Sequence, residues 1–191
     1  MKSGNIMIVG VGGQGSLLAS KLLGKLLLQR GYDVKVSEVH GMSQRGGSVV
    51  TYVRYGEKVY SPVIDRGQAD YNVSFELLEA ARWTEYLCPE GRIITNTQRI
   101  NPMPVITGAM TYPADPVKSM TDANLQVDAI DALSLAERAG SSKAVNLVLM
   151  GRLSRYFDFS TEEWMEALEK SVPAKFLEMN RKAFALGAEM E

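Results

Sequence analysis

The stretch Asn5-Ile-Met-Ile-Val-Gly-Val-Gly-Gly-Gln-Gly15 decides how the rest of the chain is interpreted. Its apolar residues 6–9 are typical of a strand that is buried on both faces of a parallel sheet. Residues 16–30 carry leucines at three- and four-residue spacings, which predicts a helix. Between them lies a turn with the G-x-G-x-x-G spacing and one extra glycine. Its residues are Gly10, Gly12, Gly13, Gln14 and Gly15.

A strand, a glycine turn and a helix in this order are the context of the dinucleotide-binding fingerprint. Glycine adopts positive φ easily and lets a ligand approach the backbone closely. The helix that follows directs unpaired N–H groups and the positive end of its dipole at the turn, where an anion is favoured. A tight strand-to-helix turn that binds nothing has the same sequence features. Both interpretations stay open on the turn alone.

Composition indicates a globular protein without a general attraction to polyanions. The chain has 191 residues, so we expect a single domain, 1–191, and its 46% hydrophobic content is normal for a globular fold. The net charge of −1 argues against nucleic-acid or anionic-membrane partners. The first strand begins at residue 5, which leaves no room for a signal peptide. We therefore expect a cytoplasmic location.

A single cysteine, Cys88, limits the redox chemistry of the chain. One thiol cannot form an internal disulfide, and it cannot hold an iron–sulfur cluster that needs four protein ligands. No cluster of His, Cys and Asp has the spacing of a metal site.

The predicted fold class is α/β, with a Rossmann-like, mostly parallel sheet, an inserted β-hairpin and a helical C-terminal part. The sheet is predicted to contain the strands 5–10, 33–38 and 70–75, the second of them reached by a right-handed crossover from the first. The hairpin is predicted near 48–60, with 48–55 and 58–60 as its arms. Further predicted elements are a helix over 76–87 ended by Cys88-Pro89, a strand at 92–95, a short strand at 104–107, a strand at 125–128, a helix over 129–139, a buried apolar run at 145–150, a capping box at Ser160 and a last helix from Pro173 to Glu189.

A second glycine-rich loop, 39–47, carries the remaining candidates for chemistry. His40 is the only histidine, and Ser43 lies three residues away, but no G-x-S-x-G elbow accompanies them. A hydrogen bond that shapes the loop is the simpler role for His40. The guanidinium of Arg45 suits a carboxylate or a phosphate, or equally an ion pair with a glutamate of this chain or of a partner.

An alternative function comes from Glu38, which ends the predicted second strand 23 residues after Gly15. In a nicotinamide-binding fold, an acid at this place binds the ribose hydroxyls. The fingerprint and Glu38 together favour a stand-alone NAD(P)-binding enzyme or sensor. The polar loop and the predicted hairpin that follow depart from that pattern.

Three strings together resemble a known family. They are Gly10-Val-Gly-Gly-Gln-Gly15, Glu38-Val-His-Gly-Met-Ser-Gln-Arg-Gly-Gly-Ser48 and Ser61-Pro62. They are similar to the gamma domain of the 2-oxoacid:ferredoxin oxidoreductases, and the resemblance extends over nearly the whole chain. The second string is the most specific of the three when it is paired with the first.

The resemblance implies a subunit that is inactive alone. In the family, a large alpha-type partner binds thiamine diphosphate and Mg and carries the iron–sulfur clusters. The complex oxidatively decarboxylates 2-oxoacids, among them aryl 2-oxoacids such as indolepyruvate, with CoA, and it yields acyl-CoA, CO2 and reduced ferredoxin. We therefore expect no cofactor, metal or catalytic residue in this chain, and CoA as a co-substrate at the interface. The expected ligand- or partner-binding residues are Gly10, Gly12, Gly13, Gln14, Gly15, His40, Gly41, Met42, Ser43, Gln44, Arg45, Gly46 and Gly47.

Overall fold

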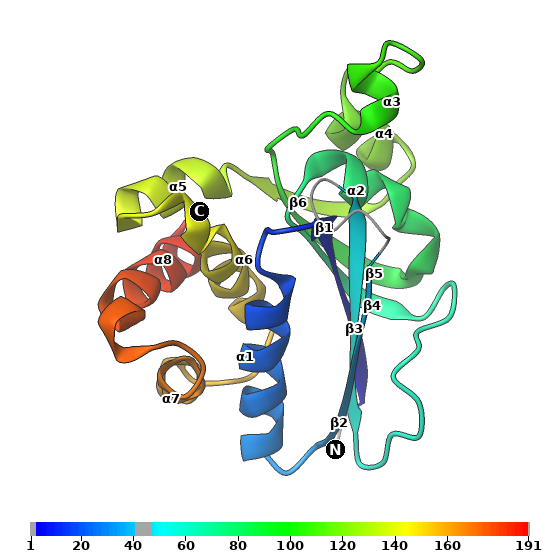
Figure 1. The fold of residues 1–191 in the computed structure, drawn as a ribbon. Helices are drawn as coiled ribbons and strands as arrows, with labels where there is room; N and C mark the ends of the chain where they lie inside the picture. The colour runs from blue at the N-terminus through cyan, green and yellow to red at the C-terminus, as the bar shows by residue number, and fades with distance from the viewer. Residues whose placement is uncertain (1–2, 41–46, 191) are drawn as a thin grey trace.

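A computed structural model describes residues 3–40 and 47–190, which form a six-stranded sheet between two layers of helices (Figure 1). The strand order is β2-β3-β1-β4-β5-β6. Only β3 runs against the others, since it pairs antiparallel with both β1 and β2 whereas β1, β4, β5 and β6 pair in parallel. The α/β class with a mostly parallel sheet is thereby confirmed. The strands are β1 (Gly4–Val11), β2 (Asp33–His40), β3 (Ser48–Gly56), β4 (Ala69–Ser74), β5 (Leu87–Asn96) and β6 (Gln126–Ile130).

Helices cover both faces of this sheet. On one face α1 packs against β1, β2 and β3, with the C-terminal helices α5 to α8 around it, and on the other face lie α2 and α4 (Figure 1). No helix in the described ranges has the length and apolar character needed to cross a membrane. The helices are α1 (Ser16–Gln29), α2 (Leu77–Arg82), α3 (Met103–Ile106), α4 (Pro116–Asp122), α5 (Ala132–Ala139), α6 (Val145–Ser154), α7 (Thr161–Glu169) and α8 (Leu177–Glu189), with 3-10 turns at Thr84–Tyr86, Ser142–Ala144 and Ala174–Phe176.

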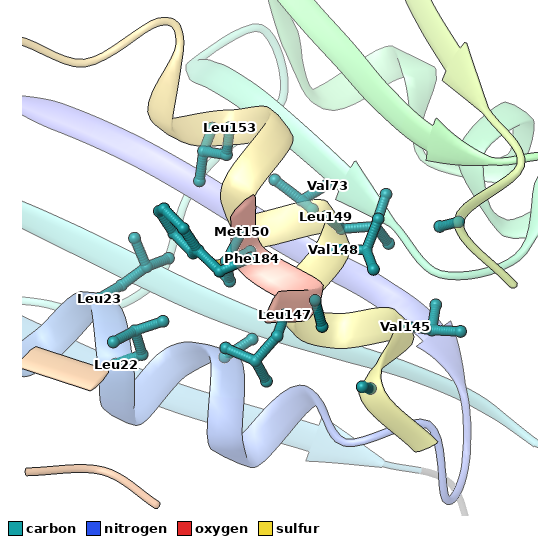
Figure 2. Close-up of a cluster of buried hydrophobic side chains, with 14 of the residues drawn as sticks. Leu22, Leu23, Val73, Val145, Leu147, Val148, Leu149, Met150, Leu153 and Phe184 are labelled. Carbon is teal, nitrogen blue, oxygen red and sulfur yellow. The ribbon is translucent and has the colours of Figure 1, made fainter. Parts of the chain in front are cut away.

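The larger core lies on the α1 face, where α6 is buried on every side. Its apolar run was expected to be buried, and this is confirmed, because Leu147, Val148, Leu149 and Met150 are at most 1% exposed. Figure 2 shows these side chains between the leucines of α1, Val73 of β4 and Phe184 of α8. A helix that is apolar all round needs such complete enclosure.

Helices α6 and α8 approach each other through two glycines. A Cβ placed on Gly151 would overlap the carbonyl oxygen of Phe184, and a Cβ placed on Gly187 would overlap the carbonyl oxygen of Val148. The backbones therefore touch at this crossing, and no other residue type fits at either position without a shift of one helix.

The antiparallel part of the sheet differs from its prediction. A hairpin is present, but its arms are β2 and β3, and the predicted 48–55/58–60 pairing is wrong. The backbone N–H of Val59 donates to the Asp33 carboxylate at 2.9 Å, and Tyr60 is 89% exposed, so 58–60 is a loop. Because β3 lies between β1 and β2, residues 33–40 run in the same direction as β1 without pairing with it.

Two other local predictions are wrong, and several are confirmed. The helix predicted over 76–87 ends at Arg82, because Leu87 and Cys88 already belong to β5 and Leu87 lies opposite Ala69. The strand predicted at 104–107 is the short helix α3, which has a proline in its first turn, where proline is well tolerated. The strand predicted at 92–95 lies within β5, the capping box of Ser160 with Glu163 is present, and a helix reaches Glu189 after a 3-10 turn. The strand predicted at 125–128 is β6, which begins at Gln126 and continues to Ile130, so the helix predicted over 129–139 begins only at Ala132, as α5.

Candidate functional site

The first glycine-rich turn leaves the carboxyl end of β1 and requires glycine at two positions. Gly13 and Gly15 have φ of +97° and +88°, values that other residues rarely adopt. A Cβ on Gly13 would meet nothing within 4 Å, so this glycine faces open space. A Cβ on Gly15 would lie 2.6 Å from the Nδ2 of Asn146, which donates to the Gly15 carbonyl at 3.2 Å. The turn is therefore fixed on one side by α6 and open on the other.

Gln14 has a structural role in this turn. Its Oε1 accepts a hydrogen bond from the Val11 backbone N–H at 2.7 Å, and its Nε2 donates to the Phe75 carbonyl at 3.1 Å. The side-chain amide thus joins the end of β1 to the residue that follows β4. Gln14 was predicted to bind a ligand or a partner, and in this structure both ends of its amide are used within the chain.

The N-terminus of α1 is open to an anion. Gly15 is the N-cap residue, no side chain caps the helix, and its first turn contains no acidic residue. A helix of 14 residues presents the positive end of its dipole and unpaired N–H groups at this point. The Glu38 carboxylate lies nearby and accepts from the Ser16 hydroxyl at 2.9 Å and from the Thr51 hydroxyl at 3.1 Å.

This arrangement of Glu38 bears on the nicotinamide alternative. In the Rossmann strand order the second strand lies beside the first, so that its terminal acid reaches the ribose. Here β3 separates β2 from β1, and the Glu38 carboxylate links α1 to β3. The strand insertion and the carboxylate's existing partners weaken the main argument for NAD(P) binding.

The two glycine-rich loops meet at the carboxyl end of the sheet, as expected from the common direction of β1 and β2. The Gly12 N–H donates to the Gly47 carbonyl at 3.0 Å, and the backbone of His40 still pairs with Val49 on β3. The remainder of the second loop lies outside the described residues, and so its predicted site residues have no described geometry. These residues are Gly41, Met42, Ser43, Gln44, Arg45 and Gly46.

A cleft of about 490 Å³ opens beside the first loop on the α1 face. Its lining includes Gly13 and Gly15 of the first loop together with Gln98, Ser142 and Lys143. The exposed Lys143 adds a positive charge to the same cleft as the N-cap residue of α1, Gly15. Sequence reasoning missed Lys143 and Gln98, because Lys143 reaches the cleft through the contact of α6 with the first loop, and Gln98 reaches it because β5 ends at the same edge of the sheet.

A second cleft, of about 240 Å³, lies on the α2 face and contains two buried carboxylates. Glu79 accepts from the Ser48 hydroxyl at 2.5 Å and from the Arg82 Nε at 3.0 Å. Glu76 caps α2 by accepting from the Glu79 backbone N–H at 2.8 Å. Both acids already have several donors, which is how proteins accommodate buried charge. The two clefts flank the point between β1 and β4 where the helices change face, a usual ligand position in open α/β sheets.

The geometry is suited to binding. It offers backbone donors, a helix N-terminus and Lys143 to an anion. Within 3–40 and 47–190 no three His, Cys, Asp or Glu side chains are grouped as metal ligands would be.

The comparisons with known proteins agree with this fold and these motifs. The family model described as pyruvate ferredoxin/flavodoxin oxidoreductase matches residues 5–190. The indolepyruvate oxidoreductase subunit IorB of Thermococcus kodakarensis is 46% identical over 192 residues, which cover 98% of this chain and 95% of that protein.

Two solved structures have the same fold. The gamma subunit of a keto/oxoacid ferredoxin oxidoreductase from Geobacter sulfurreducens has a TM-score of 0.72 and 23% identity, over 97% of this chain and 96% of that one. A 2-oxoglutarate:ferredoxin oxidoreductase from Magnetococcus marinus, solved with 2-oxoglutarate, coenzyme A and succinyl-CoA, has a TM-score of 0.72 and 19% identity. That match covers 98% of this chain and 30% of the other.

Proposed function

The chain belongs to the pyruvate ferredoxin/flavodoxin oxidoreductase family, and we propose that it is the beta subunit of an indolepyruvate:ferredoxin oxidoreductase. The supporting observation is a match over 98% of the chain to a relative named indolepyruvate oxidoreductase subunit IorB, together with both glycine-rich strings of the family. The complex would oxidatively decarboxylate aryl 2-oxoacids with CoA to acyl-CoA, CO2 and reduced ferredoxin.

In this proposal the chain is a single-domain, non-cluster subunit that is inactive alone. A large alpha subunit in the same cytoplasmic complex supplies thiamine diphosphate, Mg and the iron–sulfur clusters and passes electrons to ferredoxin. The lone thiol of Cys88 supports this division, since clusters of this kind need several protein thiolates. Purified alone, the chain is expected to contain no stoichiometric iron or sulfide.

The two glycine-rich loops would act at the mouth of the partner's active site. The uncapped N-terminus of α1 and Lys143 suit an anionic group, either a CoA phosphate or a carboxylate of the large subunit. The hydrogen bond between the Gly12 N–H and the Gly47 carbonyl supports a shared role, because it joins the last residue of the second loop to the first loop.

The test compares Arg45→Ala and Lys143→Ala with Lys182→Ala, a control at an exposed residue of α8. Each variant is reconstituted with the large subunit, and CoA-dependent ferredoxin reduction with indolepyruvate is assayed. A charge-assisted contact contributes about 1.5–3 kcal/mol, so the first two variants should raise the apparent CoA requirement or weaken assembly by roughly ten- to hundredfold. If both Arg45→Ala and Lys143→Ala assemble and require CoA as the wild type does, this end of the sheet does not bind an anionic group of CoA or of the large subunit. An absence of assembly with the wild-type chain would exclude the subunit role.

A further inference from the structure

An uncharged segment projects from the carboxyl end of the sheet between β5 and α4. Residues 101–114, here called the arm, contain no charged side chain in a chain that is 23% charged. Figure 1 shows α3, which belongs to the arm, standing away from the body of the fold. Met103, Ile106 and Met110 are 65%, 64% and 65% exposed. Exposed apolar groups gathered on one projection are typical of an interaction surface.

The arm has a defined local structure. The Thr107 N–H donates to the Met103 carbonyl at 2.9 Å, and the Met110 N–H folds back to the Pro104 carbonyl at 2.9 Å. Gly108 permits this return with a φ of +77°. The apolar side chains are therefore presented on an ordered backbone, which lowers the entropy lost when a partner binds.

A buried carboxylate ties both ends of the arm to the sheet. Glu76 is 1% exposed, and its Oε1 accepts from the Ile100 N–H at 3.0 Å and from the Tyr112 hydroxyl at 2.6 Å. Arg99 lies over the Tyr112 ring at 5.3 Å. Burying a carboxylate is unfavourable unless its hydrogen bonds are made, so Glu76 favours this one position of the arm strongly.

The position of the arm connects it with the candidate site. Met103 and Pro104 border the cleft of about 240 Å³ that also includes Gly47 and Ser48. The exposed apolar surface is therefore continuous with the place where the two glycine-rich loops meet.

We propose that the arm docks into an apolar groove of the large partner subunit and so holds the glycine-rich loops against that subunit. This inference rests on the proposed function, because it names the surface through which that partner is bound. A partner surface without charge is the complement of an uncharged arm, since a charge facing it would be desolvated without compensation. Methionine adapts to irregular apolar grooves.

Other occupants fit less well. Segments that bind membrane surfaces usually combine apolar residues with Lys and Arg, and the arm contains no Lys and no Arg. A second copy would need an apolar groove, and the cleft beside the arm contains Glu76, Glu79 and Arg82.

The experiment compares Ile106→Glu with Leu28→Glu in the full chain co-expressed with the large subunit. Leu28 is a matched control because it is 59% exposed and lies near the end of α1 farthest from the first glycine turn. Ile106→Glu should keep the wild-type melting temperature and lower the affinity for the large subunit on the order of tenfold or more. Leu28→Glu should assemble normally.

Methionine oxidation gives a second measurement that needs no substitution. In the free chain, dilute peroxide should oxidise Met103 and Met110, whereas in the complex both should be protected and the 37% exposed Met190 should react as before. Assembly of Ile106→Glu at wild-type affinity, or equal oxidation of Met103 in both states, would overturn the arm's role and leave the subunit assignment standing. Vesicle binding or self-association that Ile106→Glu abolishes without affecting the complex would also overturn it. Failure of the wild-type chain to assemble would remove both proposals.

Discussion

Replacement of Gln14 by leucine tests whether this residue holds the first glycine turn together or contacts a ligand. Leucine fills a similar volume and removes both polar atoms. The Val11 N–H, which now donates to Gln14 at 2.7 Å, would lose its partner in a half-buried place. The Phe75 carbonyl would lose one donor at 3.1 Å but would keep the Nδ2 of Asn96 at 3.3 Å.

The two losses therefore differ in cost. A net hydrogen bond contributes about 0.5–1.5 kcal/mol, and a buried group left without any partner costs about 1–3 kcal/mol. The Val11 N–H is half-buried, so its loss lies near the lower limit of the second range, and the loss at the Phe75 carbonyl lies near the lower limit of the first. Their sum predicts a loss of roughly 2 kcal/mol in the free energy of unfolding. For a chain of this size that corresponds to about 4–8 °C in melting temperature.

Urea denaturation of the isolated chain measures this quantity without any ligand or partner. Gln68→Leu is the matched control, because Gln68 is exposed and its side chain makes no hydrogen bond among the described residues. An unchanged midpoint for Gln14→Leu, combined with a loss of activity in the reconstituted complex, would refute the structural role and return Gln14 to the ligand-binding set.

Three further predictions follow from the geometry of the turn, of α7 and of the sheet. Gly13→Ala should lower the free energy of unfolding by about 1–2 kcal/mol because of the positive φ alone. Gly15→Ala should lower it more, because the new methyl group would also press on Asn146; thermal melts that rank the two variants in the opposite order would contradict this. A side-chain hydrogen bond from Arg30 lowers the pKa of Glu163 from 4.5 to about 2, so its stabilisation is complete above pH 4.5 and is lost as the pH falls through about 2. Melting temperatures should therefore fall more steeply in this window for the wild type than for Glu163→Gln, and parallel curves would contradict the assignment. Calorimetric titration should detect no tight binding of NAD or NADP, and a micromolar dissociation constant would restore the nicotinamide alternative.

The parts of the fold that sequence predicted are those decided by local chemistry. The first turn needs positive φ at Gly13 and Gly15, and the capping box at Ser160 is a matter of residues three apart. Residues 145–150, which lie in α6, are apolar on nearly every side of the helix, so their burial follows from composition. Each of these features can be seen within a short window of the sequence.

The errors concern partners that are distant in sequence. Nothing between 48 and 60 indicates that β3 pairs with residues 33–40 on one side and with β1 on the other, because pairing is decided by the faces that become buried. Lys143 reaches the cleft only through the contact of α6 with the first loop, and the internal bonds of Gln14 depend on where β4 ends. Candidate residues could therefore be named from motifs, but their division into structural and binding roles required the tertiary arrangement.

The close approach of α6 and α8 at Gly151 and Gly187 has a consequence for how this sequence can vary. After proline, glycine has the lowest intrinsic helix propensity, and alanine would stabilise either helix by roughly 1 kcal/mol in isolation. In the folded chain the same methyl would have to separate two backbones that are already in contact. Local and tertiary preference thus oppose each other at two positions 36 residues apart. A change at the other position cannot compensate, because neither glycine has a side chain that could be made smaller. A larger residue at either position therefore requires α8 to shift as a whole relative to α6.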